Sequence, residues 1–394
     1  MRSLTFKLRL AVLFVFLSLS LFAALVRADG PDTGSSTSEI KLPPGIPFEV
    51  WDYFVPKDNP VTAAKVELGK KLFFDKRLSA DGSVSCATCH DPKLAFTDGK
   101  PVAEGIHGRK GSRSSPTLLN AMFNSGQFWD GRVESLESQS KLPLVNPDEM
   151  GNASQEQVVE RLRAFPEYAG RFQQVFGDLT VNSLGKALAS YERTLVTADS
   201  PFDRYRAGDS KAMSDAAKQG LFLFTGKARC TVCHTFNSIF ASTQSFPFFT
   251  DQMYHNTGVA VNDPAYAAIS RKAVLLARNG PRESELQELA KEAGASSLGR
   301  FLVTGNSLDI GAFKTPSLRN VELTAPYFHD GSVATLADVV KFYGKGGNHN
   351  PNRDWELQAV SLTDTEQLEL IEFLKSLTSY DTRKLSTQDV ALTR

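Results

Sequence analysis

The chain has 394 residues and carries 44 basic and 44 acidic side chains, so its formal net charge is zero. Because neither sign is in excess, the composition gives no support to binding of nucleic acid or of an acidic membrane surface. The length is sufficient for two compact domains even after removal of a leader segment.

The N-terminus has the pattern of a secretory signal peptide. Basic residues precede a largely apolar run over residues 10–26, and a small residue suited to cleavage follows at Ala28. The alternative is an uncleaved anchor, because the run is long for a signal peptide and short for a membrane span. In either case the folded part is exported, so we expect a signal peptide over residues 1–28 and a periplasmic protein.

Apolar spacing after the leader predicts a mainly α-helical protein. Residues 29–45 are rich in Ser, Thr, Gly and Pro, and we expect a flexible linker there. From residue 46 onward, apolar residues recur at helical spacing between long loops, and no segment has a convincing strand pattern. The predicted helices cover residues 65–74, 155–165, 181–196, 215–224, 335–343 and 363–377.

Polar residues at the predicted helix starts strengthen several of these predictions. Ser154 and Ser214 stand where a hydroxyl can accept a hydrogen bond from the first helical turn. Thr363 and Glu366 have the spacing of a capping box, in which each side chain binds the backbone of the other residue. Helical periodicity then predicts the buried face of the last helix as Leu368, Ile371, Leu374 and Leu377.

All four cysteines of the chain occur in two Cys-x-x-Cys-His segments. In such a segment the thiols bond covalently to the vinyl groups of a haem, and the adjacent His ligates the iron. A single copy would be hard to distinguish from half of a zinc site. Two copies, with no cysteine left over and an export signal upstream, predict two covalently bound c-type haems. The predicted haem-binding residues are Cys86, Cys89, His90, Cys230, Cys233 and His234.

A weak internal repeat predicts two related domains. A Gly followed by a Leu-Phe pair precedes each haem motif, at residues 69–73 and 220–222. We therefore expect two c-type-cytochrome-like helical domains, with one covalent haem each, over residues 46–205 and 206–385. Residues 264–297 are polar and charged with one helical pattern, and we expect an inserted surface excursion there.

Further motifs lie between and after the two haem segments. They are Ser-Ser-Pro-Thr-Leu-Leu-Asn at 114–120, Gln-Phe-Trp-Asp-Gly-Arg at 127–132, Phe-Lys-Thr-Pro-Ser-Leu-Arg-Asn at 313–320 and Leu-Thr-Ala-Pro-Tyr-Phe-His-Asp-Gly at 323–331. Together with the haem motifs, they resemble the bacterial di-haem cytochrome c peroxidase family, which includes the methylamine-utilisation enzyme MauG. The similarity extends over about residues 47–377, and it implies an oxidoreductase that acts on hydrogen peroxide.

The resemblance implies a role for each of several residues. His90 would ligate the iron of a peroxidatic haem, and His234 that of an electron-transfer haem. Trp129 would carry electrons between the haems. Gln139 and Glu149 occupy positions of the family's peroxide pocket. There Gln139 would orient peroxide, and Glu149 would be the acid/base that moves a proton from the iron-bound oxygen to the leaving oxygen.

The resemblance leaves two iron-ligand positions open. His107 matches a family His that closes the peroxidatic iron in the oxidised resting enzyme, and the alternative is an ordinary loop residue. Tyr343 follows His329 at the spacing where typical peroxidases have a Met iron ligand and MauG has Tyr. A phenolate favours ferric iron, whereas a thioether favours ferrous iron. Tyr343 either ligates the second iron or packs its helix, and Met253 is the alternative ligand.

A calcium site is also implied by the resemblance. Thr324 and Pro326 match two positions whose carbonyl groups bind calcium in the family, but Ser114 stands where the family has an Asn ligand. A hydroxyl is a weaker ligand for this hard cation, so the resemblance leaves occupancy open. His255 and His329 are expected to anchor loops or haem propionates rather than to bind iron.

These features predict a periplasmic di-haem peroxidase that reduces hydrogen peroxide with electrons from a small c-type cytochrome or copper protein. The alternative is a MauG-like enzyme that oxidises aromatic side chains of a partner protein, and Tyr343 favours it, whereas His107 favours the peroxidase. Ala228 stands where MauG has an electron-transfer Trp, so the route to a partner would differ. A di-haem electron carrier without catalysis is a third reading. Members of the family are often homodimers, which this sequence leaves open.

Overall fold

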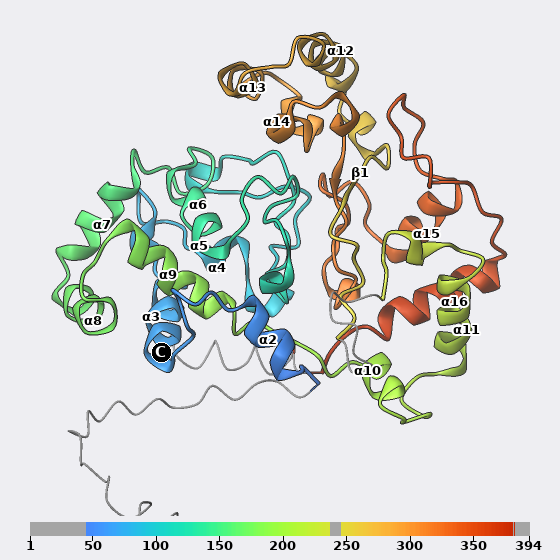
Figure 1. The fold of residues 1–394 in the computed structure, drawn as a ribbon, viewed down its shortest axis with the longest axis horizontal. Coiled ribbons are helices and arrows are strands. Elements are labelled where there is room, and N and C mark those ends of the chain that lie inside the picture. Colours follow the sequence, from blue (N-terminus) through green and yellow to red (C-terminus); the bar gives the residue numbers. More distant parts are fainter. Residues whose placement is uncertain (1–44, 237–245, 381, 383–394) are drawn as a thin grey trace, which may run out of the picture. The chain divides into compact units, whose positions relative to one another are not determined.

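The computed structural model describes residues 45–236, 246–380 and 382. The predicted signal peptide and residues 29–44 of the predicted linker lie outside the described residues. The described part belongs to one compact unit, and its division into two domains remains a prediction. Helices dominate this unit, which confirms the mainly α fold class (Figure 1).

The first of two tightly crossed helix pairs consists of α3 (Ala63–Phe73) and α9 (Val181–Glu192). A threonine begins each helix, and its hydroxyl accepts a hydrogen bond from the backbone of the first turn. A Cβ atom at Gly69 would lie 1.9 Å from the carbonyl oxygen of Ala187, so the crossing depends on glycine. The core around this pair includes Leu68, Leu72, Phe73, Leu184 and Leu188.

The second crossed pair consists of α11 (Asp215–Thr225) and α16 (Asp364–Lys375). A Cβ atom at Gly220 would lie 1.9 Å from the carbonyl oxygen of Glu369, which repeats the close approach of the first pair. The two helices lie side by side in Figure 1. Their core contains Phe202, Leu223, Phe224, Phe249, Leu370, Phe373 and Leu374.

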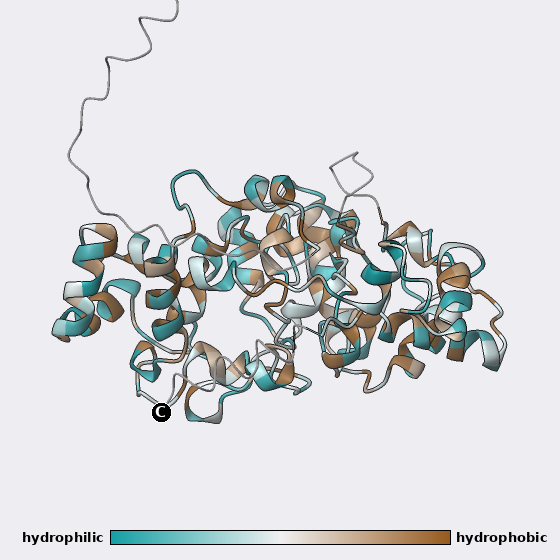
Figure 2. Cartoon of the chain, turned by 90° about the horizontal axis from the view of Figure 1, so that it is seen from below, coloured by the Kyte–Doolittle hydropathy of each residue, from teal (hydrophilic) through white to brown (hydrophobic). Residues whose placement is uncertain are grey.

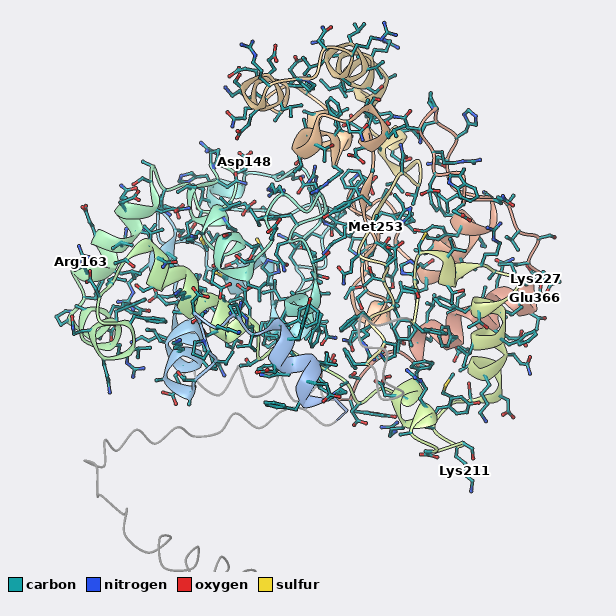
Figure 3. The ribbon with its side chains drawn as sticks, viewed as in Figure 1. Asp148, Arg163, Lys211, Lys227, Met253 and Glu366 are labelled. Atoms are coloured by element: carbon teal, nitrogen blue, oxygen red, sulfur yellow. The ribbon has the colours of Figure 1, made fainter. Side chains whose placement is uncertain are left out.

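The predicted helix caps are confirmed. Ser154 and Ser214 each accept a hydrogen bond from a backbone N–H of the turn that follows. Thr363 and Glu366 form the predicted capping box at the start of α16. Lys227 pairs with Glu366, with 2.6 Å between Nζ and Oε1, so the segment after α11 is tied to this cap (Figure 3).

The second helices of the two pairs, α9 and α16, correspond position by position together with the segments that follow them. Ala187 in α9 and Glu369 in α16 face the two crossing glycines. Beyond the helices, the backbone N–H groups of two asparagines donate to the carbonyl oxygens of Leu195 and Leu377. Leu195 follows Ala187 by the same number of residues as Leu377 follows Glu369. Positions in α9 and α16 therefore correspond, in agreement with the weak repeat in the sequence.

The loops that carry the family motifs form a second repeat. Asn120 and Asn320 both have left-handed backbones, with φ of 62° and 60°, and so do Phe128 and Phe328, with φ of 66° and 70°. An antiparallel bridge closes each loop at matching positions. Phe128 follows Asn120 by the same number of residues as Phe328 follows Asn320, so the loops align without a gap. We call this correspondence the loop repeat.

A buried polar cluster joins the two repeated loops. Thr197 is fully buried, and its hydroxyl accepts hydrogen bonds from the side-chain amides of Asn120 and Asn320, at 3.2 Å and 2.8 Å. The backbone N–H of Thr197 also donates to the side chain of Asn120. One hydroxyl therefore holds the two halves of the repeat together.

Three sequence predictions about elements are wrong in detail. Leu368 is 64% exposed, although it was expected in the buried face of α16. Residues two apart on a helix point to nearly opposite sides, and α16 directs Leu370 toward α11. The excursion over residues 264–297 contains two helices rather than one, and they pack around a small core of their own. Two short strands, which the sequence did not predict, pair antiparallel through Tyr254 and Lys314.

Figure 2 shows teal and brown residues alternating along many of the helices, as expected of amphipathic helices that pack on a core. The remaining helices and strands follow in chain order. They are α2 (Phe48–Phe54), η1 (Lys76–Leu78), α4 (Cys86–Cys89), η2 (Pro92–Leu94), η3 (Ile106–Gly108), η4 (Ala121–Phe123), α5 (Leu136–Gln139), α6 (Leu142–Val145), α7 (Gln155–Arg163), α8 (Pro166–Phe176), α10 (Pro201–Arg206), η5 (Cys230–Val232), β1 (Tyr254–His255), η6 (Val259–Asn262), α12 (Tyr266–Ala277), α13 (Glu283–Leu289), η7 (Ala295–Leu298), α14 (Phe301–Thr304), η8 (Ser307–Asp309), β2 (Phe313–Lys314), η9 (Val321–Leu323) and α15 (Leu336–Gly344).

Candidate active site

The first Cys-x-x-Cys-His segment forms a single helical turn, α4. The backbone N–H of Ser85 donates to the hydroxyl of Thr88 at 2.9 Å, which fixes the start of the turn. The turn places its two cysteines on one side, where both thiols can reach one haem. His90 follows directly as the C-cap of the turn.

Both motif histidines make the same hydrogen bond. Nδ1 of His90 lies 3.1 Å from the carbonyl oxygen of Phe96, and Nδ1 of His234 lies 2.9 Å from that of Phe249. A proton on Nδ1 donates to the carbonyl group and leaves the lone pair of Nε2 available to a metal ion. Burial lowers the pKa of both imidazoles, which keeps them neutral. Each histidine therefore fits the role of an iron ligand.

A cavity of about 930 Å³ opens beside His90, and its size is ample for a haem. Gln139, Pro143 and Glu149 line it together with His90. The same residues also line a smaller cavity of about 60 Å³ that reaches Cys86. The structure thus brings the predicted peroxide pocket and the first haem-attachment segment together.

Glu149 has the environment that an acid/base catalyst needs. Its side chain is half-buried, and the amide of Asn146 donates to its Oε1 at 2.7 Å. Burial raises the pKa of Glu149, against the opposing effects of Arg132 and of the Asn146 hydrogen bond. A carboxyl with a raised pKa binds a proton more readily than an ordinary Glu and can return it, as an acid/base catalyst must.

Trp129 lies at the contact between the two repeated loops. Its indole Nε1 donates to the carbonyl oxygen of Ser114 at 2.9 Å, and its own carbonyl accepts from the backbone of Lys314 at 2.8 Å. The centre of its ring is 6.5 Å from that of His329, and Trp129 lines the large cavity. These contacts hold the indole in one orientation within reach of residues from both halves of the chain.

Tyr343 lies in α15 near the second haem-attachment segment. Burial raises its pKa, and the charges of Cys233 and Cys230 add to the shift. In the loop repeat, Tyr343 corresponds to Pro143, which lines the peroxide pocket of the first half. A role for Tyr343 as a ligand of the second iron remains a prediction. Met253, the alternative ligand, is 60% exposed (Figure 3).

His107 is not brought into the peroxide pocket. Its side chain is 61% exposed, and Nδ1 lies 3.5 Å from a carboxylate oxygen of Asp81. His107 does not line either of the two cavities that contain Glu149. Its place in this structure is that of a loop residue.

His255 and His329 have different structural roles. His255 pairs with Asp251 and Asp354, and its pKa rises to about 11, chiefly through the hydrogen bond to Asp251. These two contacts anchor the loop of Asp251 and the loop of Asp354 to β1. His329 is buried and stacks on Phe313 with 3.5 Å between ring centres. Its pKa falls to about 3, first through burial and then through the charge of Arg113.

The three residues of the implied calcium site, Ser114, Thr324 and Pro326, all line the large cavity. The carbonyl of Ser114 already accepts from Trp129, and its backbone N–H donates to the carbonyl of His329 at 2.8 Å. Their gathering in one cavity is compatible with a shared cation, and occupancy remains a prediction.

Sequence reasoning missed three charged residues of the cavity wall. Arg113 is half-buried there and paired with Asp130, and Lys314 is buried, which lowers its pKa to about 7. Such cations suit the propionate groups of a haem. Glu192 is a buried acid that lines both cavities. Its position within the apolar pattern of residues 181–196 was the one signal in the sequence that could have identified it.

The fold and the paired histidine sites define a helical c-type cytochrome with places for two haems and a pocket beside the first. A family model described as di-haem cytochrome c peroxidase matches residues 63–211. The methylamine utilization protein MauG of Methylorubrum extorquens is 37% identical over 360 residues, which cover 90% of this chain and 88% of the relative. A cytochrome-c peroxidase of Pseudomonas sp. strain SCT is 37% identical over 354 residues, or 88% of each chain.

A solved MauG-like protein associated with microbial copper homeostasis superposes with a TM-score of 0.67. It is 31% identical, and the match covers 87% of this chain and 96% of that protein. This chain therefore belongs to the di-haem cytochrome c peroxidase family, and it carries two covalently bound haem c groups. Among residues 45–236 and 246–380, no helix is long and apolar enough to cross a membrane.

Proposed function

We propose that this protein is an oxidoreductase that reduces hydrogen peroxide to water in the periplasm. A small c-type cytochrome or copper protein supplies the electrons. The observation that carries the proposal is the half-buried carboxyl of Glu149, which shares one cavity with Gln139 and His90. Peroxide reduction needs a proton carrier at this place, whereas a simple electron carrier does not.

The first haem, when bound, supplies the iron that binds peroxide and accepts electrons. The side-chain amide of Gln139 orients peroxide by hydrogen bonding. Glu149 takes the proton from one peroxide oxygen and returns it to the other as the O–O bond breaks. Pro143 adds an apolar wall that limits access of water. The balance is one peroxide, two electrons and two protons to two waters.

Trp129 is the proposed path for electrons from the His234 haem to the His90 haem. Its contacts with residues of both repeated loops support this role. Ser114, Thr324 and Pro326 are the proposed calcium ligands, since they line one cavity near this path. A homodimer remains a proposal from family resemblance alone.

A MauG-like enzyme that oxidises aromatic side chains of a partner protein is the second candidate. Tyr343 lies near the second haem-attachment cysteines, as a hard anionic ligand for that iron would. His107 is exposed and lines neither cavity, which supports a first iron that would be open to peroxide in the oxidised protein. Both features favour this candidate over a reductively activated peroxidase.

The optical and EPR response to one equivalent of hydrogen peroxide tests both candidates. The fully oxidised protein and the one-electron-reduced protein are compared. A reaction of the oxidised form that gives a long-lived oxidised species spread over both haems indicates the MauG-like activity. An inert oxidised form that reacts after reduction indicates a peroxidase closed by His107. No reaction in either state would contradict both and leave an electron carrier.

A further inference from the structure

The helix α9 ends in a buried acid that the proposed mechanism does not use. Glu192 is only 5% exposed, and its Oε2 has no hydrogen-bond partner among the described residues. It lines both cavities, and so do Gln139 and Glu149. Burial of a carboxyl group without a partner is unfavourable for folding, which marks Glu192 as a functional rather than a structural choice.

The second helix pair shows which residue occupies the position of Glu192 when only packing is required. Positions in α9 and α16 correspond at a constant spacing, and the alignment that pairs Ala187 with Glu369 pairs Glu192 with Leu374. Leu374 is buried in the core of the second helix pair. An apolar side chain thus satisfies the packing of this crossed pair, and the acid is specific to the half that contains the peroxide pocket.

Burial of Glu192 in the cavity wall favours its protonated form. Burial raises its pKa to about 8, while the positive charge of Arg193 opposes the shift and the negative charge of Glu137 adds to it. Arg193 is already paired with Glu137, with 2.7 Å between NH1 and Oε1. The other titratable side chains that line the smaller cavity with Glu192 are Cys86, Cys89, His90 and Glu149.

We propose that Glu192 is a second proton donor of the peroxide pocket. The inference rests on the proposed function and deepens it. Glu149 moves a proton between the two peroxide oxygens and ends unchanged, so the two protons that balance the two electrons must enter from elsewhere. Glu192 passes one of them through water in the shared cavity and regains a proton from solvent. The electrons come from the small cytochrome or copper protein.

The test uses the haem-loaded protein and three substitutions. Glu192→Gln keeps the shape and removes the exchangeable acid, Glu192→Leu copies the second half, and Glu192→Asp keeps an acid. We expect peroxide turnover to fall about 10²-fold in the first two variants and to recover at least partly in the third. Haem content and optical spectra should be those of the wild type. Glu160→Gln, on the exposed side of α7, is the matched control and should retain full turnover.

An infrared difference spectrum between the oxidised and reduced protein provides a readout that packing alone would not move. The wild type should show the carbonyl band of a buried protonated carboxyl that shifts in heavy water, and Glu192→Gln should lack this band. If Glu192→Leu fails to fold, the turnover of Glu192→Gln and the infrared band still test whether Glu192 donates a proton.

Two further outcomes separate this inference from the proposed function. Wild-type turnover by Glu192→Gln, or an unchanged infrared band, would overturn the role of Glu192. If Glu149→Gln is inactive in that case, the proposed function stands without it. A wild-type protein that does not turn over peroxide in any redox state would overturn the proposed function and this inference together.

Discussion

At the scale of single residues, burial decides which carboxyl groups of this protein can do acid/base chemistry. Glu149 is half-buried at the wall of the large cavity, and its pKa is raised. Its neighbour Asp148 is exposed, and Figure 3 shows it at the surface. The two side chains carry the same functional group, but only that of Glu149 is partly buried in the cavity wall.

Glu149→Gln should abolish most peroxide turnover. The amide has the same shape but cannot accept the proton of peroxide, so the rate should fall by about 10² to 10⁴-fold. In the wild type the raised pKa should move the acidic limb of the pH–rate profile above the range of an ordinary Glu, because the acceptor must be ionised. Steady-state peroxide reduction across pH measures both effects.

The control for this variant is Glu156→Gln on the exposed side of α7, and haem content should be unchanged in both proteins. A Glu149→Gln variant that retains the wild-type rate and the same acidic limb would remove Glu149 from the mechanism.

Tyr343→Met should raise the reduction potential of the second haem. Exchange of a phenolate for a neutral thioether removes a hard anionic ligand from the ferric iron, and a shift of about 0.1 V or more is expected within the range that axial ligands span. A spectroelectrochemical titration measures it. Tyr343→Phe, which loses only the oxygen, should change the spectrum of the same haem. Identical titrations for all three proteins would show that Tyr343 is not a ligand.

At the scale of elements, two glycines set the distance between crossed helices. At Gly220 an added methyl group would lie 1.9 Å from the carbonyl oxygen of Glu369 and 2.8 Å from Cβ of Phe373. Because backbone atoms on the opposite helix cannot rotate away, the helices would have to separate. The approach of α11 to α16 therefore depends on one missing side chain.

Gly220→Ala should lower the free energy of unfolding by about 1–3 kcal/mol, the usual effect of overpacking a tight contact. Gly170→Ala, in α8, is the matched control, because no atom lies within 4 Å of the added methyl group. Helix propensity predicts that the control is neutral or up to about 1 kcal/mol more stable. Urea unfolding of the haem-loaded proteins compares them, and equal destabilisation would contradict the packing argument.

The positions of the helices could be predicted from the sequence better than the side of each helix that is buried. Hydroxyl caps at Ser154, Ser214 and Thr363 act within a single helical turn and are visible in the chain itself. Leu368 was misplaced because the buried side of α16 depends on where α11 lies, and periodicity alone does not fix that. The short strand pair of Tyr254 with Lys314 depends on contacts between distant segments, which no local pattern carries.

The candidate active site could be predicted only in part. The haem motifs and the positions of Gln139 and Glu149 could be found by their spacing, and the structure brings both side chains to one cavity with His90. Glu192 and Lys314 were missed, because burial of a charged side chain is a property of the folded chain. Whether Tyr343 binds iron is still a prediction.

At the scale of the whole molecule, one hydroxyl links the repeated loops. Thr197 accepts hydrogen bonds from Asn120 and Asn320, and all three are buried. Loss of this acceptor leaves two amide donors buried without a partner. Such groups are costly because water cannot replace the lost hydrogen bond.

Thr197→Val should destabilise the protein by about 2–5 kcal/mol, since each unsatisfied donor contributes about 1–3 kcal/mol. Thr225→Val, at an exposed position of α11, is the control and should have little effect. Chemical unfolding followed by haem absorbance and by far-ultraviolet circular dichroism measures both variants. A Thr197→Val protein as stable as the wild type would show that the loops hold together without this hydroxyl.

The loop repeat has a consequence for how such a molecule can diversify. It has the geometry of a duplicated unit whose two copies have kept the same loops and bridges but differ at several aligned positions, among them Pro143 in one and Tyr343 in the other. Proline has no side-chain atom that could bind iron, so that copy keeps space for a substrate. The phenol of a tyrosine could bind the iron of the other copy and fill that space. Two copies of one ancestral unit can thus take on different tasks through changes at a few positions, while the shared scaffold stays the same.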